Sequence, residues 1–204
     1  MIALTDAFAL LGITLAVCAG CLTVFYATRG IRFRPRYAQI VLMFLVLFVL
    51  LAPMRGPFPI VFYIRGFSSD LSITLVVLSL WGICHRFGLI KPVERREFQV
   101  LMVAIAIGAL ILYPTALGLG NWDAYRLGWG PWGFLLVLLG LCSVSVWMGL
   151  RLLPALVALA LLAWSSDLME SGNLWDYLID PWLSFFALGF VFIKCVQSIR
   201  RRFS

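Results

Sequence analysis

The amino-acid sequence predicts an all-α integral membrane protein that crosses the bilayer about seven times. Of its 204 residues, 63% are hydrophobic and 12% are charged, whereas a soluble globular chain is about half apolar and a quarter charged. The mean hydropathy is +1.04, and apolar runs recur along the chain, which indicates helices in lipid. The polar stretches between these runs are too short for a soluble domain. Residues 1–204 are therefore predicted to form a single transmembrane helical domain.

Seven apolar segments can be assigned as spans, although several fall short of the ~20 residues that a transmembrane helix needs. They are residues 7–27, 37–54, 67–84, 98–113, 131–150, 152–164 and 181–196. The fifth and sixth segments meet at Arg151, which lies between Gly149 and Pro154. Because proline breaks the interior of a helix, a tight turn is favoured at this point over one continuous helix. Six spans is the alternative.

The first span is predicted to be a membrane anchor and not a cleaved signal peptide. No basic residue precedes it, Asp6 lies just before it, and positive charges follow it, which is the reverse of a secretory signal. Lys and Arg accumulate on the cytoplasmic side of membrane proteins. An outer N-terminus and a cytoplasmic C-terminus place 13 of the 16 basic residues inside and seven of the nine acidic residues outside. The segregation of both charge types favours this orientation.

Composition also predicts where the protein resides and which functions are excluded. Arg outnumbers Lys by 14 to 2 and the outer side is acidic, so the bacterial inner (cytoplasmic) membrane is the expected location. The net charge of +7 follows from topology and from attraction to anionic lipid, and no nucleic-acid partner is predicted. The middles of the spans carry no Asp, Glu, Lys or His, which argues against an ion or proton pump.

No metal or other cofactor is predicted. The five cysteines lie within spans or at their inner ends, so no disulfide framework is expected. Cys18 and Cys21 have redox spacing, but a thiol in an apolar helix stays protonated. The small residues Ala16 and Gly20 favour close helix packing there instead. The acidic residues of the last outer loop could bind a divalent cation, but an ordinary solvated loop is favoured.

The loop between the second and third spans is apolar, broken by prolines and closed by an arginine at each end. It is expected to lie at the membrane interface or to re-enter the membrane. Arg55, Arg65 and Arg126 are the only basic residues on the predicted outer side. They either bind a lipid phosphate, with Asp70 or Asp123 as acid or base, or pair with outer carboxylates such as Asp70 or Asp123 to hold the loops together. Ion pairing is the favoured interpretation.

Two outer loops, residues 120–126 and 172–177, resemble each other. Each places Trp, Asp and Tyr close together and is followed by a Pro-Trp pair. They are either products of an internal duplication or two separate capped loops anchored by an aromatic belt, and the second is favoured. Asp180 directly precedes Pro181 and is expected to cap the last helix. The predicted outer-face contact residues are Trp122, Tyr125, Trp175, Asp176, Tyr177 and Asp180.

These features predict a non-catalytic scaffold or accessory subunit of a bacterial envelope assembly system that handles lipid, glycan or polymer. Besides membrane lipids, its outer face would contact a membrane or periplasmic protein partner or a lipid-linked phosphate substrate. Small size and missing catalytic motifs favour this reading. The alternative is a lipid-handling transferase or flippase in which the three outer arginines bind phosphate. The sequence leaves open whether the protein is an enzyme.

Overall fold

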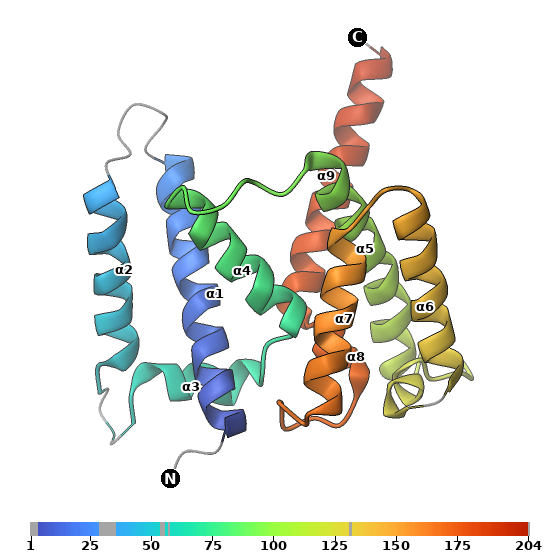
Figure 1. Ribbon diagram of the computed structural model, residues 1–204, viewed down its shortest axis with the longest axis horizontal. Helices are drawn as coiled ribbons and strands as arrows, with labels where there is room; N and C mark the ends of the chain where they lie inside the picture. Colours follow the sequence, from blue (N-terminus) through green and yellow to red (C-terminus); the bar gives the residue numbers. More distant parts are fainter. Residues whose placement is uncertain (1–3, 29–35, 54–55, 57, 131, 204) are drawn as a thin grey trace. The chain divides into compact units, whose positions relative to one another are not determined.

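The computed structural model describes residues 4–28, 36–53, 56, 58–130 and 132–203. All regular elements in this part of the chain are helices, and no strand occurs in it (Figure 1). The elements are α1 (Leu4–Thr28), α2 (Arg36–Leu51), α3 (Ile60–Ser68), α4 (Ile73–Arg86), α5 (Arg95–Ala116), η1 (Tyr125–Trp129), α6 (Trp132–Trp147), α7 (Leu152–Ser165), α8 (Leu174–Leu178) and α9 (Pro181–Phe203).

The predicted all-α class is confirmed, and three helices have the length and composition of membrane spans. The qualifying segments lie in α1, α5 and α9 and contain 24, 22 and 21 residues. The helices α2, α4, α6 and α7 are apolar but shorter, with 14 to 16 residues each. A straight helix of 16 residues is about 24 Å long, which is less than the roughly 30 Å of a bilayer core. The count of seven spans therefore stays a prediction.

The third predicted segment begins at the wrong residue. The sequence interpretation started it at Phe67, whereas α3 continues to Ser68 and α4 begins only at Ile73. The chain turns at Ser69, which has a φ of 58° and whose N–H donates to the Arg65 carbonyl at 2.8 Å. The polar residues Ser68, Ser69 and Asp70 mark this turn in the sequence, but the run is too short to separate the apolar residues around it in a hydropathy pattern.

The predicted break at Arg151 is confirmed. Helix α6 ends at Trp147 and α7 begins at Leu152. Gly149 adopts a φ of 77°, a left-handed conformation that glycine accepts without steric cost. Pro154 lies in the first turn of α7, where its missing N–H leaves no hydrogen bond unmade.

The chain divides into two compact units. Unit 1 contains α1 to α3, the part of α4 from Leu75 onward, and residues 167–170. Its core includes Ile13 on α1, Val61 on α3 and Val76 on α4. Helices α1 and α4 approach closely at Gly12, where an added Cβ would lie 2.9 Å from Val76 Cγ2. The predicted close contact at Gly20 is not found, since an added Cβ there would meet nothing within 4 Å.

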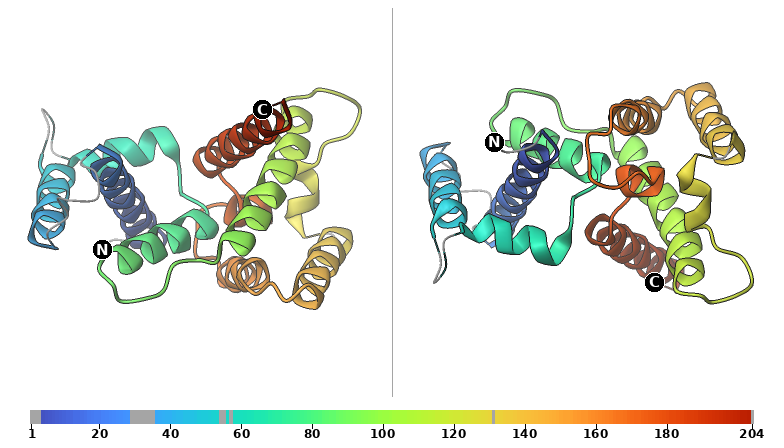
Figure 2. Two further views of the ribbon diagram at one scale, coloured as in Figure 1. Left: turned by 90° about the horizontal axis from the view of Figure 1, so that it is seen from above. Right: turned by 90° about the horizontal axis from the view of Figure 1, so that it is seen from below.

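Unit 2 contains residues 72–74, α5 to α7, η1, α8 and α9. Helix α5 lies between α9 and α7, and α6 packs on the other side of α7 (Figure 2). Met102 on α5, Ala160 on α7 and Ala187 on α9 are completely buried. The short segments η1 and α8 contact each other at one end of this bundle.

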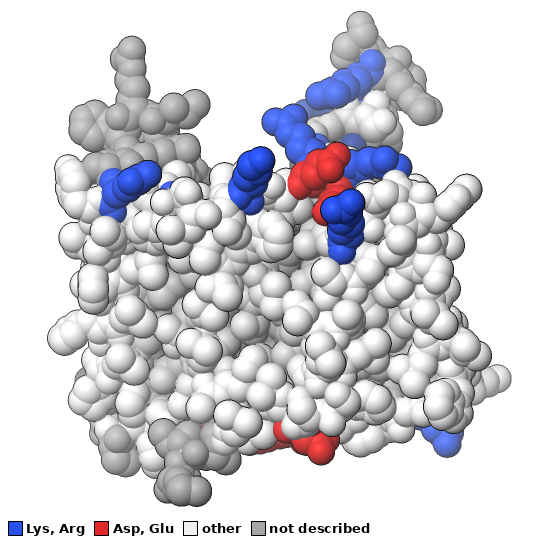
Figure 3. All heavy atoms as spheres, viewed as in Figure 1, with Lys and Arg blue, Asp and Glu red and all other residues white. Residues whose placement is uncertain are grey.

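Charged side chains of both units lie at the ends of the helices (Figure 3). One end of each unit is called the outer end, after the predicted topology. In unit 1 the outer end carries Asp6, Arg65, Asp70 and Glu170, and the opposite end carries Arg36, Arg86 and Lys91. In unit 2 the outer end carries Asp123, Arg126, Asp176 and Asp180, and the opposite end carries Arg95, Arg96, Arg151 and Arg201. Within each unit, the distribution agrees with the charge pattern from which the orientation is predicted.

Candidate functional site

The outer end of unit 1 is organised around Arg65, in the last turn of α3. Its guanidinium group contacts three carboxylates, each through a different nitrogen. Nη1 donates to Asp6 Oδ1 at 2.5 Å, Nη2 to Glu170 Oε1 at 2.6 Å and Nε to Asp70 Oδ1 at 3.2 Å. The Arg65 side chain is only 16% exposed. These four residues are called the Arg65 cluster.

The surroundings of Arg65 favour its charged form. The hydrogen bond to Asp6 raises the pKa of Arg65, and the charges of Asp70 and Glu170 act in the same direction, against the opposing effect of burial. Asp70 also accepts a hydrogen bond from the Glu170 backbone N–H at 3.2 Å. Arg65 therefore holds together the start of α1, the α3–α4 connection and residues 167–170.

The structure places Arg65 and Asp70 of the predicted site together. The pairing of Arg65 with Asp6 and Glu170 could not be foreseen, since these residues are 59 and 105 positions away along the chain. Three of the five N–H donors of the guanidinium already bind carboxylates, and these three negative charges oppose the approach of a phosphate. Arg55, the other arginine of this loop, lies outside the described residues.

The outer end of unit 2 is built by the two similar loops, which bind each other. Asn173 is completely buried; its Nδ2 donates to the Tyr125 carbonyl at 2.9 Å, and its Oδ1 accepts from the Trp175 N–H at 3.0 Å. The Trp175 Nε1 donates to the Ala124 carbonyl at 2.9 Å. Neither interpretation of the loop resemblance includes this direct contact. We call these two hydrogen-bonded loops, residues 120–126 and 172–177, the loop lock.

Three hydrogen-bonded side chains complete the loop lock. The Tyr125 hydroxyl donates to Asp176 Oδ2 at 2.8 Å, and the Ser171 hydroxyl donates to the same oxygen at 2.5 Å. Burial, followed by the hydrogen bond to Asp176 and its negative charge, raises the pKa of Tyr125 to about 12. Tyr125 thus remains a protonated donor at neutral pH and is poorly suited to act as a base.

Asp180 joins the start of α9 to the residues that precede α4. Its Oδ2 accepts hydrogen bonds from the N–H and hydroxyl of Ser72 at 3.0 and 2.5 Å. Its Oδ1 accepts from the Leu183 N–H at 2.9 Å, which confirms the predicted capping of this helix. Asp180 is 4% exposed and Tyr177 is completely buried. These two predicted contact residues therefore lie inside unit 2 and not on its surface.

Other residues of this end have exposed side chains. Trp122 is 53% exposed, and Trp129, Trp132 and Trp182 are at least half exposed. Arg126 on η1 is also exposed and has no ion pair within the described part of the chain. Asp123 accepts a hydrogen bond from the Tyr125 N–H at 2.9 Å through Oδ1. The outer aromatic surface is defined as Trp122, Arg126, Trp129, Trp132 and Trp182.

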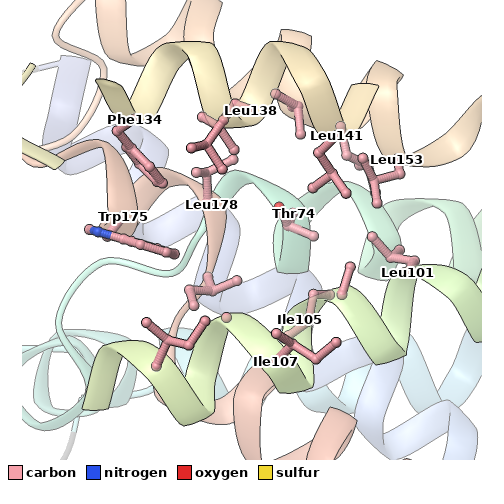
Figure 4. Close-up of a pocket in the computed structure, with 17 residues that line it drawn as sticks. Thr74, Leu101, Ile105, Ile107, Phe134, Leu138, Leu141, Leu153, Trp175 and Leu178 are labelled. Atoms are coloured by element: carbon pink, nitrogen blue, oxygen red, sulfur yellow. The ribbon is translucent and has the colours of Figure 1, made fainter. Parts of the chain in front are cut away.

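Unit 2 also contains an apolar cavity of about 260 Å³. Leu138 on α6 and Ile105 on α5 face it from opposite sides, and Trp175 lies near one end (Figure 4). The Trp175 ring packs on Phe134, with the ring centroids 4.4 Å apart. Trp175 thus contributes both to the cavity wall and to the loop lock. Hydropathy gave no indication of the cavity, because its lining resembles every other apolar surface of the chain.

Gly128 allows η1 to lie against Asn173. A Cβ added at Gly128 would be 1.7 Å from Asn173 Oδ1 and 2.8 Å from Trp175 Cδ1. We therefore expect Gly128→Ala to displace Asn173 and to lower the midpoint of SDS-induced unfolding, with a cost of about 2 kcal/mol. Gly133→Ala is the matched control, since nothing lies within 4 Å of a Cβ there. Equal stability of the two variants would show that the loop lock does not require this close contact.

The described residues include no group of three or more His, Cys, Asp or Glu side chains placed to hold a metal ion. Comparisons with protein-family models, with curated proteins and with solved structures found no match to this chain. Its function is therefore inferred from the arrangement of its own residues.

Proposed function

We propose that this chain is a non-catalytic membrane subunit of a bacterial envelope assembly system, which docks a membrane or periplasmic partner through the outer aromatic surface of unit 2. The loop lock is the observation that carries this proposal. Asn173, Tyr125, Asp176 and Asp180 use their polar groups to hold the loops and helix ends together. The large aromatic rings beside them are left exposed.

A rigid loop pair with exposed tryptophans suits a docking role. Binding energy at protein interfaces is concentrated in a few residues, among which Trp and Arg are enriched. The exposed side chains of Trp122 and Trp132 need little reorganisation when the loops beneath them are already ordered. A belt of interfacial tryptophans accounts for the same exposure, so the experiment must separate binding from membrane insertion.

The alternative transferase or flippase has less support. Its phosphate clamp was assigned to Arg55, Arg65 and Arg126. Arg65 is engaged with three carboxylates, so its charge is already paired within unit 1. Only Arg126 is described as both exposed and unpaired.

The docking role is tested by extracting the protein with its native lipid and identifying stoichiometric co-purifying proteins. We expect Trp122→Ala and Trp132→Ala to reduce partner recovery about tenfold, as hot-spot truncations of 1 to 2 kcal/mol would. Trp147→Ala is the matched control, because Trp147 is 87% exposed at the other end of unit 2. Equal recovery from all three variants, at equal membrane content, would refute the docking surface. Trp175→Phe is not a suitable probe, since its Nε1 is bonded inside the loop lock.

The proposed topology has seven spans with an outer N-terminus. In a cysteine-free background, single cysteines at Ser69 and Asn121 should react with an impermeant thiol reagent from outside sealed cells. Cysteines at Arg95 and Arg151 should react only after the membrane is opened. The Arg151 site decides between seven and six spans, because it lies between the short helices α6 and α7. If residues 131–164 crossed as one span, this site would lie within the membrane and react from neither side. Labelling from outside would exclude both helices as spans and leave five.

A further inference from the structure

The apolar cavity of unit 2 opens sideways between α5 and α6. Its inner wall is buried, with Leu156 on α7 at 2% and Leu178 on α8 at 8% exposure. The rim of the cavity is exposed, since Ile107 on α5 and Val137 on α6 are 54% and 66% exposed. In a bilayer, such a rim between two apolar helices faces the hydrocarbon region.

The cavity favours a hydrocarbon chain as its occupant. Thr74 is the only residue in its lining with a polar side chain other than the Trp175 indole, and that indole N–H is bonded to the Ala124 carbonyl. A water molecule needs two to four polar partners and would be poorly held in such a lining. The volume of about 260 Å³ lies just below the range of small-molecule sites, about 300 to 1,000 Å³, which suits one chain better than a whole lipid.

A positive charge lies at the outer end of the same helices. Segment η1 packs against α5, α6 and α8, all of which line the cavity. Arg126 is on η1, two residues after the carbonyl that holds Trp175 in the cavity wall. It is exposed, and the nearby Asp123 uses Oδ1 to bind the Tyr125 N–H. A guanidinium at headgroup level binds a phosphate through two parallel hydrogen bonds.

We propose that unit 2 binds an anionic glycerophospholipid of the outer leaflet, with one acyl chain in the cavity and the headgroup phosphate at Arg126. The second chain stays in the bilayer, which the open rim permits. One guanidinium matches the single negative charge of a phosphodiester. A lipid monophosphate or diphosphate carries more charge, which one arginine would leave partly unpaired. The site shares Arg126 with the outer aromatic surface, and its place in the outer leaflet rests on the proposed topology, but lipid binding does not require the proposed partner.

The test uses the full-length protein in phosphatidylcholine nanodiscs with a trace of phosphatidylglycerol that carries a diazirine on one acyl chain. After illumination, peptide mapping should find the label on α5 and α6 around Ile107 and Val137, and unlabelled phosphatidylglycerol should compete. Label spread evenly over the apolar helices of both units would overturn the site. Stronger competition by a polyprenyl phosphate would overturn the assignment of the occupant.

Two pairs of variants separate the chain site from the phosphate site. Gly108→Leu places a side chain in the cavity, where an added Cβ lies at ordinary contact distance from Ile179, and should reduce labelling at least tenfold. Gly140→Leu is its control, because that position is exposed and an added Cβ meets nothing within 4 Å. Arg126→Gln should reduce labelling by phosphatidylglycerol about fivefold and labelling by diazirine phosphatidylcholine much less, because the choline ammonium already neutralises that phosphate, whereas Arg151→Gln should change neither. Unchanged labelling in Gly108→Leu, or equal effects of Arg126→Gln on both lipids, would overturn the proposal.

Discussion

Replacing Asp180 by alanine should lower the free energy of unfolding of unit 2 by about 3 kcal/mol, because it leaves three hydrogen-bond donors without their acceptor. Two of these donors belong to Ser72, which is completely buried, and the third is the Leu183 N–H in the first turn of α9. The variant thus loses both the cap of α9 and the buried charged acceptor of Ser72. SDS titration in mixed micelles, followed by tryptophan fluorescence, measures this effect. Seven of the eight tryptophans lie in unit 2, and the eighth is Trp81.

A second substitution removes the charge of Asp180 but keeps the size of its side chain. Asp180→Asn keeps one acceptor oxygen but turns an amide N–H₂ toward the donors of Ser72 or Leu183, so we expect about half of the alanine effect. Glu94→Gln is the control within unit 2, because Glu94 is exposed and its side chain makes no capping hydrogen bond. If Asp180→Asn and Glu94→Gln are equally stable, the three hydrogen bonds contribute nothing to folding.

Replacing Arg65 by alanine should destabilise unit 1 by about 2 to 3 kcal/mol. Removing one member of a fully buried ion pair costs roughly 3 to 5 kcal/mol, and the Arg65 cluster is only partly buried: the side chain of Asp6 is 35% exposed and that of Glu170 is 67% exposed. The stability of this unit is measured as the temperature at which the buried Cys18 thiol becomes reactive, in a variant without the other four cysteines. Arg126→Ala serves as the control and should leave the transition unchanged.

The carboxylates of the Arg65 cluster should contribute to the stability of unit 1 in the order of their burial. Asp70, with a side chain only 7% exposed, should be the most sensitive to amide substitution, followed by Asp6 and then Glu170. Arg65→Lys should recover less than half of the lost stability, because an ammonium group cannot reproduce the arginine's planar arrangement of donors to three carboxylates. Full stability in Arg65→Lys would show that the charge alone holds the outer end of unit 1 together.

The sequence alone was sufficient for the all-helical class, for apolar helices long enough to span a membrane and for much of the helix order. Composition is a property of the whole chain, and long apolar runs can satisfy their backbone hydrogen bonds in lipid only within helices. The break at Arg151 and the cap at Asp180 were also predictable, because both depend on residues that are neighbours along the chain. The late start of α4 was missed, since the polar turn before it, Ser68 to Asp70, is too short to interrupt an apolar segment assigned by hydropathy.

The roles of individual polar residues were decided by tertiary structure. Arg65 and Arg126 are equivalent as outer arginines in the sequence, yet Arg65 binds three carboxylates and Arg126 is exposed. Tyr177 and Asp180 belong to the same aromatic, acidic pattern as Trp122, but folding buries the first two and leaves the tryptophan on the surface. These differences depend on contacts between residues far apart along the chain. A local pattern supplies the chemical groups, and only the packing of the helices determines which of them are paired, buried or free to bind.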